Sequence, residues 1–328
     1  MVDINKTPGI HDIRSAAERI KGIVDRTPLL ESERLNDHAG ARVFLKCEMF
    51  QPVGSFKLRG AWNMISRLAD SRIKNGVIAY SSGNHAQAVA WSALRRGVKA
   101  TIIMPLDAPT VKVNNTKALG AKLVLYDRTK EDRELIAKKL AGRTGAVIIP
   151  PYDHPDVIAG QGTVGLEAVE QLRDAGVTPD VVIVPCSGGG LIAGCAIAVK
   201  AAFPCTRILA AEPEHFDDTK RSLQAGRRVA NKHGYSSVCD ALLVCTPGRM
   251  TFEVMRRMVS GGEVVSETEI RAAVRAAFLY ANIVVEPGGV VGLAATLSGR
   301  LTSPAETICV ILSGGNIDRE LFAELISN

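Results

Sequence analysis

The stretch DVVIVPCSGGGLIAGCAIAVKAAF, residues 180–203, can be interpreted in two ways. Nineteen uncharged residues lie between Asp180 and Lys200, which is nominally long enough to span a bilayer. Pro185 and three consecutive glycines at 188–190 stand in the middle of this stretch. A glycine turn there would leave backbone groups unpaired in lipid. We therefore predict a buried strand, a loop and a helix, and no membrane span.

The same alternation of short apolar runs and longer helical patterns extends in both directions along the chain. Ser266 followed by Glu269 is a capping-box pattern that predicts where one of the helices begins. Alternating strands and helices are typical of an α/β fold with parallel sheets covered by helices on both faces. The patterns predict strands at 77–80, 99–105, 121–127, 146–150, 180–185, 207–213 and 307–315, and helices at 86–96, 111–120, 130–142, 162–176, 190–203 and 266–282.

Composition and charge exclude several classes of protein. The 328 residues suggest about two domains, and 46% of them are apolar. Although the net charge is +6, forty basic residues are mixed with thirty-four acidic ones, so a nucleic-acid partner is not predicted. The first twenty residues contain no apolar signal segment. The seven cysteines form no CxxC pair, which favours reduced thiols in the cytoplasm.

The loop Ser187, Gly188, Gly189, Gly190 and Leu191 follows a predicted strand and precedes a predicted helix. Converging N–H groups and the positive end of the helix would make it a phosphate cradle. The alternative is a tight turn that only packs helix on strand. The loop is neither GxGxxG nor a P-loop ending in GKS or GKT, so a small phosphorylated cofactor is favoured over a dinucleotide or a triphosphate.

Two further segments carry residues with useful chemistry. Lys57 lies in GSFKLRGA at 54–61, where apolar neighbours would favour a neutral, nucleophilic amine; a solvated surface lysine is the alternative. Arg59, two residues later, is a candidate anion partner. The turn SSGNHAQA at 81–88 would present N–H donors to a carboxylate, or be an ordinary helix cap. For His85 alone, a solvated or core histidine is favoured.

Six motifs, PVGSFKLRGA, SSGNHAQAVA, IAGQGT, CSGGGLIAG, EPGGVVGLAA and LSGGN, occur in this order between about Thr27 and Gly315. Together they resemble the fold-type II pyridoxal-phosphate enzymes, in the threonine dehydratase and serine racemase branch. The resemblance implies a tryptophan synthase β-like fold of two three-layer α/β/α domains, with the cofactor in the cleft between them. It places residues 1–52 and 150–328 in a large domain and residues 53–149 in a small mobile one.

The resemblance also implies roles for individual residues. Lys57 would carry the cofactor as an imine and act as a base, and Ser82 would act as acid or base on the opposite face. The remaining implied cofactor contacts are Phe56, Asn84, the loop Ser187, Gly188, Gly189, Gly190 and Leu191, and Ser313, and the implied substrate-carboxylate contacts are Ser81, Ser82, Gly83, Asn84 and His85.

Ser313 would face the pyridine nitrogen, and a hydroxyl there would make the ring a mild electron sink suited to β-elimination. The resemblance thus implies an ammonia-lyase that converts L-threonine or L-serine to a 2-oxo acid and ammonia. Serine racemase and 3-hydroxyaspartate dehydratase are the alternatives within the family. A non-catalytic ligand-binding protein on the same fold is an alternative of a different class.

A metal site and an oligomer are further implications of the resemblance. Glu212, the carbonyl of Phe216 and Asp218 would bind Mg²⁺ or Ca²⁺, which prefer oxygen ligands. The alternative is a solvated acidic turn. Arg133 lies where the family sometimes has a substrate-gating arginine, although a solvated helix face is the simpler interpretation. A homodimer or homotetramer is expected.

Overall fold

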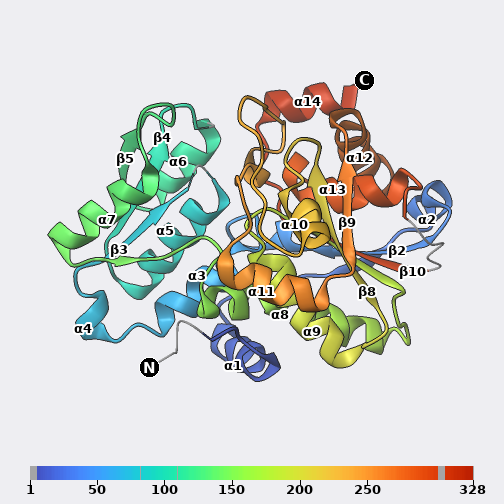
Figure 1. Ribbon diagram of the computed structural model, residues 1–328, viewed down its shortest axis with the longest axis horizontal. Helices are drawn as coiled ribbons and strands as arrows, with labels where there is room; N and C mark the ends of the chain where they lie inside the picture. Colours follow the sequence, from blue (N-terminus) through green and yellow to red (C-terminus); the bar gives the residue numbers. More distant parts are fainter. Residues whose placement is uncertain (1–5, 82, 109, 302–306, 328) are drawn as a thin grey trace.

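The protein is described by a computed structural model that covers residues 6–81, 83–108, 110–301 and 307–327. Two separate sheets lie side by side in the molecule (Figure 1), one of six strands and one of four. The predicted α/β class is confirmed. No helix in the described part of the chain is both long and apolar enough to cross a membrane.

The six-stranded sheet is parallel except for β1, which runs antiparallel to β2 at one edge. In order across the sheet its strands are β1 (Leu29–Glu31), β2 (Arg42–Cys47), β10 (Thr307–Leu312), β7 (Val181–Pro185), β8 (Arg207–Pro213) and β9 (Gly261–Val265). Alternate residues of β7 enter two different cores: Val182 and Val184 one, Val181 and Ile183 the other. Both faces are therefore buried, as expected for central parallel strands.

Helices cover the two faces of this sheet (Figure 1). The first face is covered by α1 (Ile10–Ile20), α8 (Pro155–Asp174), α9 (Gly190–Ala202) and α11 (Arg249–Met258). The second is covered by α2 (Glu33–Ala39), α12 (Glu267–Ala281), α13 (Pro287–Leu297) and α14 (Arg319–Ser327). The predicted capping box begins α12, where the Ser266 N–H donates to Glu269 Oε2 at 2.8 Å.

The four-stranded sheet is entirely parallel, in the order β5 (Lys122–Tyr126), β4 (Ala100–Pro105), β3 (Val77–Tyr80) and β6 (Val147–Ile148). Val77 and Ala79 of β3 face a core shared with α3 and α5, while Ile78 faces α7. The remaining helices are α3 (Lys57–Ser66), α4 (Asp70–Ile73), α5 (Asn84–Arg96), α6 (Thr110–Ala118), α7 (Arg133–Thr144), α10 (Asp218–Ala225) and the short 3-10 turns η1 (Glu48–Phe50) and η2 (Asp240–Leu242).

Helix α8 begins two turns earlier than the sequence predicts, at Pro155 rather than residue 162. Its first part contains the glycine-rich IAGQG segment, and glycine has low helix propensity. A Cβ on Gly160 would lie 2.6 Å from the carbonyl oxygen of Arg59, and one on Gly60 would lie 2.9 Å from that of Val157. These glycines are required because α3 and α8 cross in direct backbone contact.

Candidate active site

A cavity of about 330 Å³ lies between the two sheets, a volume that fits a small cofactor. Carboxyl ends of strands from both sheets contribute to its walls, including Tyr80 and Pro105 of the small sheet and Pro185 of the large one. This is where ligands bind in open α/β folds. The predicted site residues that line it are Phe56, Lys57, Ser81, Gly83, Asn84, His85, Ser187, Gly188, Gly189, Gly190, Leu191 and Ser313. Ser82, with its predicted role, lies outside the described residues.

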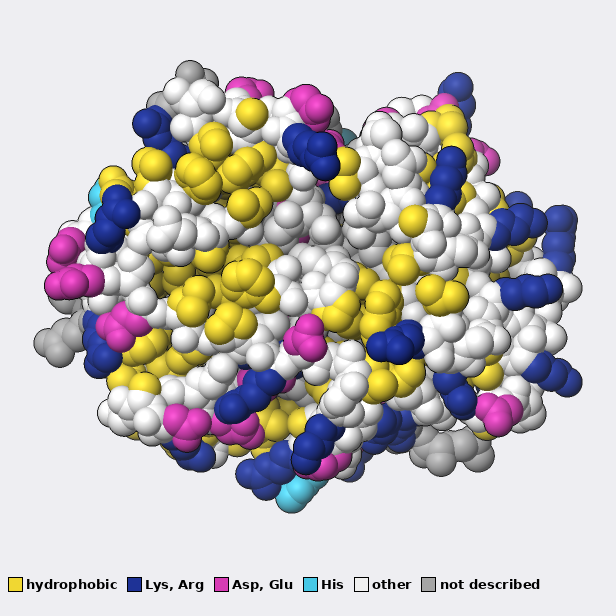
Figure 2. All heavy atoms as spheres, turned by 180° about the vertical axis from the view of Figure 1, so that it is seen from behind, with side chains coloured by type: hydrophobic (Ala, Val, Ile, Leu, Met, Phe, Trp, Pro, Cys, Tyr) yellow, Lys and Arg dark blue, Asp and Glu magenta, His cyan; other side chains and the backbone are white. Residues whose placement is uncertain are grey.

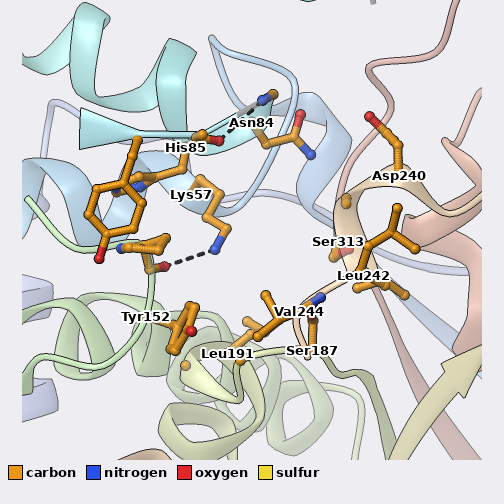
Figure 3. Close-up of a pocket in the computed structure, with 18 of the residues that line it drawn as sticks. Lys57, Asn84, His85, Tyr152, Ser187, Leu191, Asp240, Leu242, Val244 and Ser313 are labelled. Atoms are coloured by element: carbon orange, nitrogen blue, oxygen red, sulfur yellow. Dashed lines mark hydrogen bonds between the residues drawn. The ribbon is translucent and has the colours of Figure 1, made fainter. Parts of the chain in front are cut away.

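Lys57 is the first residue of α3, and its amine is directed toward the centre of the cavity (Figure 3). Lys57 Nζ donates a hydrogen bond to the carbonyl oxygen of Pro151 at 2.9 Å. Burial lowers the pKa of Lys57 to about 8, because the surrounding protein disfavours the charged ammonium. The alternative of a solvated surface lysine is therefore wrong, and the amine suits nucleophilic attack on a carbonyl.

The glycine loop has free donors on its backbone and no room for side chains. The N–H groups of residues 187–191 donate to no other group in the described parts of the chain. A Cβ on Gly188 would lie 2.4 Å from the Tyr152 ring, and one on Gly189 would lie 2.8 Å from Met255 Cε. The loop therefore packs tightly, as the tight-turn interpretation requires, and its unpaired donors at the N-terminus of α9 are compatible with the predicted phosphate cradle.

The side-chain amide of Asn84 is held in one orientation from both ends. Asn84 Nδ2 donates to Glu286 Oε1 at 2.5 Å, and Asn84 Oδ1 accepts from Asn316 Nδ2 at 2.8 Å. One N–H of Asn84 remains available to an oxygen of a bound ligand. Sequence reasoning assigned no role to Glu286 or Asn316, although both belong to the motifs EPGG and LSGGN.

An ion pair crosses the cavity wall between the two sheets. Lys112 of α6 is buried, and its Nζ contacts Asp240 Oδ2 at 2.6 Å and Glu286 Oε2 at 3.5 Å. Burial acts to lower the pKa of Lys112, but Glu286 and Asp240 outweigh it and raise that pKa above its ordinary value. Lys112 is thus a charged group of the cavity wall, and no local sequence pattern identified it.

The His85 ring presents an acceptor, not a donor. His85 Nε2 lies 2.9 Å from the Ile149 carbonyl oxygen, which can only accept, so Nε2 carries the proton. Burial and the nearby Lys57 lower the pKa of His85 to about 3, so the ring is neutral. The ring cannot donate to a carboxylate in this state. The N–H groups of Asn84 and His85 have no acceptor among the described residues, so they remain available for that role.

Glu212, Phe216 and Asp218 lie together at the end of β8 and the start of α10, and none of them lines the cavity. Glu212 accepts hydrogen bonds from the N–H groups of Thr219 and Lys220. Both carboxylates are fully buried, and Asp218 Oδ2 has no partner among the described residues. The alternative of a solvated acidic turn is therefore wrong, while a buried carboxylate oxygen without a donor fits a bound cation.

Comparison with known proteins identifies the family. The family model described as "Pyridoxal-phosphate dependent enzyme" matches residues 20–314. The chain belongs to the pyridoxal-phosphate-dependent enzymes. Lys57 and the free N–H groups of the glycine loop face one cavity, which fits an aldehyde cofactor that carries a phosphate. The interpretation as a non-catalytic binding protein is set aside.

Relatives of this pyridoxal-phosphate enzyme match over nearly its whole length. The L-threo-3-hydroxyaspartate ammonia-lyase of Saccharomyces cerevisiae is 41% identical to this chain. The aligned region covers 98% of this chain and 97% of that relative. The L-threonine ammonia-lyase of Thermotoga maritima is 38% identical, and the aligned region covers 97% of this chain and 78% of that relative. The structure of maize serine racemase is similar with a TM-score of 0.91 and 40% identity, covering 98% of both chains.

Proposed function

We propose that this enzyme eliminates water from a β-hydroxy amino acid and releases a 2-oxo acid and ammonia, with L-threonine and L-serine as the leading substrates. One observation supports the proposal most: an amine of lowered pKa, Lys57, faces the free donors of a glycine loop across a single cavity. When bound, pyridoxal phosphate would supply an electron sink for the electron pair left at Cα.

The chain's own residues would divide the remaining work. The N–H groups of the glycine loop would hold the phosphate, and the free N–H of Asn84 would donate to the phenolic oxygen of the cofactor. The Lys57 amine would take the Cα proton, which requires the neutral form that its environment favours. The N-terminus of α5 would bind the substrate carboxylate. Phe56 would pack against the cofactor ring, and Ser313 would face the pyridine nitrogen.

A second candidate substrate is the dicarboxylic amino acid 3-hydroxyaspartate, and Arg133 favours it. Arg133 lines the cavity with its guanidinium 5.7 Å from the centre of the Tyr80 ring. Arg128 pairs with Asp107, whereas Arg133 has no carboxylate partner within the described ranges. A free guanidinium matches a second substrate carboxylate, and the Saccharomyces relative is a hydroxyaspartate ammonia-lyase.

Residues 53–149 would act as the small mobile domain and residues 1–52 with 150–328 as the large one. The small sheet, residues 77–148, falls wholly within the first of these segments. The pair between Lys112 and Asp240 joins the two parts across the cavity, so it would hold a closed state that excludes water.

The cation, the oligomer and the location are also proposals. Glu212, the Phe216 carbonyl and Asp218 would bind Mg²⁺ or Ca²⁺. Apolar side chains gather in several patches on the face shown in Figure 2, which supports a homodimer or homotetramer. The cysteines of the described residues are all free thiols, which supports the cytoplasm.

The test is a substrate panel with the purified holoenzyme. L-threonine, L-serine, D-serine and L-threo-3-hydroxyaspartate are incubated separately, and 2-oxo acid, ammonia and enantiomer ratio are measured. The proposal predicts 2-oxo acid and ammonia in equal amounts, lost in Lys57→Ala. Formation of D-serine from L-serine faster than pyruvate would contradict it.

A further inference from the structure

Arg59 is a fully buried arginine that uses every N–H it has. Nε and Nη2 donate to the two oxygens of Glu48 at 2.7 and 2.8 Å, and Nη1 and Nη2 donate to the two oxygens of Glu167 at 2.7 and 2.8 Å. Longer bonds of 3.2 Å reach Thr163 Oγ1 and the Asp25 carbonyl. No donor remains for a ligand, so the sequence interpretation of Arg59 as an anion partner for the site is wrong.

The charges around Arg59 are balanced within the protein. Lys46 is also fully buried, and its Nζ contacts Glu167 Oε2 at 2.7 Å and the Thr27 carbonyl at 2.7 Å. Arg59, Lys46, Glu48 and Glu167 thus form a neutral cluster of two cations and two carboxylates. Burying such pairs seldom adds stability over well-packed apolar residues, because desolvation offsets the attraction. The cluster therefore calls for an explanation other than stability.

The position of Arg59 within α3 supplies that explanation. Lys57 and Arg59 both lie in the first turn, and two residues in a helix are about 200° apart around its axis. The two side chains therefore leave nearly opposite faces of one helix. Glu48 precedes α3 on η1, and Glu167 lies on α8. Two separate elements therefore accept hydrogen bonds from the guanidinium. Contacts that hold one face of a helix to two other elements oppose its rotation about its own axis, and Lys57 on the opposite face would turn with that rotation.

The packing of α3 against α8 leaves rotation to be restrained by polar contacts, of which Arg59 makes those in the first turn and Asn63 Nδ2, which donates to the Asp156 carbonyl at 2.6 Å, makes a later one. Gly60 and Gly160 let α3 and α8 touch through their backbones, and the Gly60 N–H donates to Gln161 Oε1 at 3.2 Å. A glycine contact permits close approach but offers no side chains that interlock against rotation. A planar guanidinium held by two bidentate carboxylates is directional, which a lysine ammonium is not.

We propose that Arg59 is the positioning residue of this enzyme: held by Glu48 and Glu167, it fixes the rotation of α3 so that the Lys57 amine stays beside the Pro151 carbonyl and points into the cavity. The inference rests on the proposed function insofar as Lys57 is the amine that carries the cofactor.

The test compares Arg59→Lys with Arg67→Lys, a matched change at the other end of the same helix. Arg67 caps the C-terminus of α3 and pairs with Asp156 of α8 at 2.8 Å, so it also links these two helices. Pyridoxal phosphate is added to each apoenzyme, and covalent attachment is followed by absorbance near ~410 nm. Attachment is then trapped by borohydride reduction, and the modified lysine is located by peptide mass mapping.

In Arg59→Lys, we expect attachment at neutral pH to be at least about tenfold slower, because a displaced Lys57 regains an ordinary pKa and is less often neutral. The pH at which the attachment rate reaches its plateau should rise accordingly. Arg67→Lys should stay within about twofold of the wild type in both measurements. Attachment in Arg59→Lys at the wild-type rate and with the wild-type pH profile would overturn the proposal.

A second variant covers the case in which Arg59→Lys does not fold. The double change Lys46→Met with Glu167→Gln removes one charge of each sign and keeps the Glu48 pair. We expect its attachment to be slowed about threefold to tenfold, with circular dichroism unchanged; an unchanged rate would again overturn the inference. If the proposed function itself fails, the wild-type label is absent or maps to another lysine, which distinguishes the two failures.

Discussion

Two helix N-termini face the cavity, and they are built in opposite ways. Helix α9 follows β7 and presents backbone N–H groups from a loop in which three successive residues have no side chain. Helix α5 follows β3 and presents polar side chains, of which Asn84 is fixed by Glu286 and Asn316. The α9 loop would thus offer backbone donors alone, which suit the cofactor phosphate. The start of α5 would combine free N–H groups for the substrate carboxylate with an oriented Asn84 amide for the phenolic oxygen of the cofactor.

The largest effect should come from adding one methyl group to the α9 loop. In Gly188→Ala the new Cβ would lie 2.4 Å from the Tyr152 ring, so the loop or the ring must move. We expect cofactor affinity to fall about a hundredfold, as for overpacking of a tight site, measured by titration of the apoenzyme. Gly142→Ala in α7 is the control, because nothing lies within 4 Å of its Cβ; equal affinity in the two variants would contradict a rigid cradle.

The next effect concerns the substrate end of the cavity. In Arg133→Met we expect kcat/KM for L-threo-3-hydroxyaspartate to fall about thirtyfold, the value of a charge-assisted hydrogen bond, while that for L-threonine changes little. Steady-state kinetics with both substrates measure the ratio. Arg128→Met is the control, since Arg128 is already paired with Asp107. An equal loss for both substrates would remove Arg133 as the discriminating group.

The pH dependence separates Lys57 from His85, which lies on α5. Below the Lys57 pKa of about 8 the amine is protonated, so attachment of the cofactor should slow about tenfold per pH unit and level off above that pKa. The pKa of His85, about 3, adds no step between pH 5 and pH 9. Stopped-flow attachment rates across this range give the profile, and a midpoint near 6.5 would point to a histidine instead.

A smaller effect should follow from loosening the Asn84 amide. In Glu286→Gln the charged acceptor of Asn84 becomes a neutral amide and Lys112 loses one carboxylate. We expect cofactor affinity to fall about fivefold, the value of one weakened hydrogen bond. Glu170→Gln is the control, as Glu170 takes part in an exposed ion pair with Arg26. If Glu286→Gln bound the cofactor as tightly as this control does, the fixed orientation of the Asn84 amide would contribute nothing to cofactor affinity.

The smallest effect should be on thermal stability. Adding millimolar Mg²⁺ or Ca²⁺ to the metal-free enzyme should raise Tm by a few degrees, because a cation would contact the partnerless Asp218 Oδ2 and offset the charge of the two buried carboxylates. Asp218→Asn should abolish the rise. The same rise in that variant would place the cation elsewhere.

The sequence predicts the two helix N-termini because each is a contiguous motif after an apolar run. It does not predict what fixes them: Asn84 and Glu286 are 202 positions apart and meet only in the folded chain. Lys112 has no motif at all, and the early start of α8 is hidden by glycines that exist for packing against α3. Local pattern thus locates the donors, whereas their partners depend on tertiary contacts.

The most direct test of this active site is the identity of the lysine that carries the cofactor. Wild-type holoenzyme is reduced with borohydride and digested, and the pyridoxyl-labelled peptide is sequenced by mass spectrometry. We predict a single labelled peptide that contains Lys57. A label on any other lysine, or none in a cofactor-saturated sample, would contradict the assignment of this cavity as the active site.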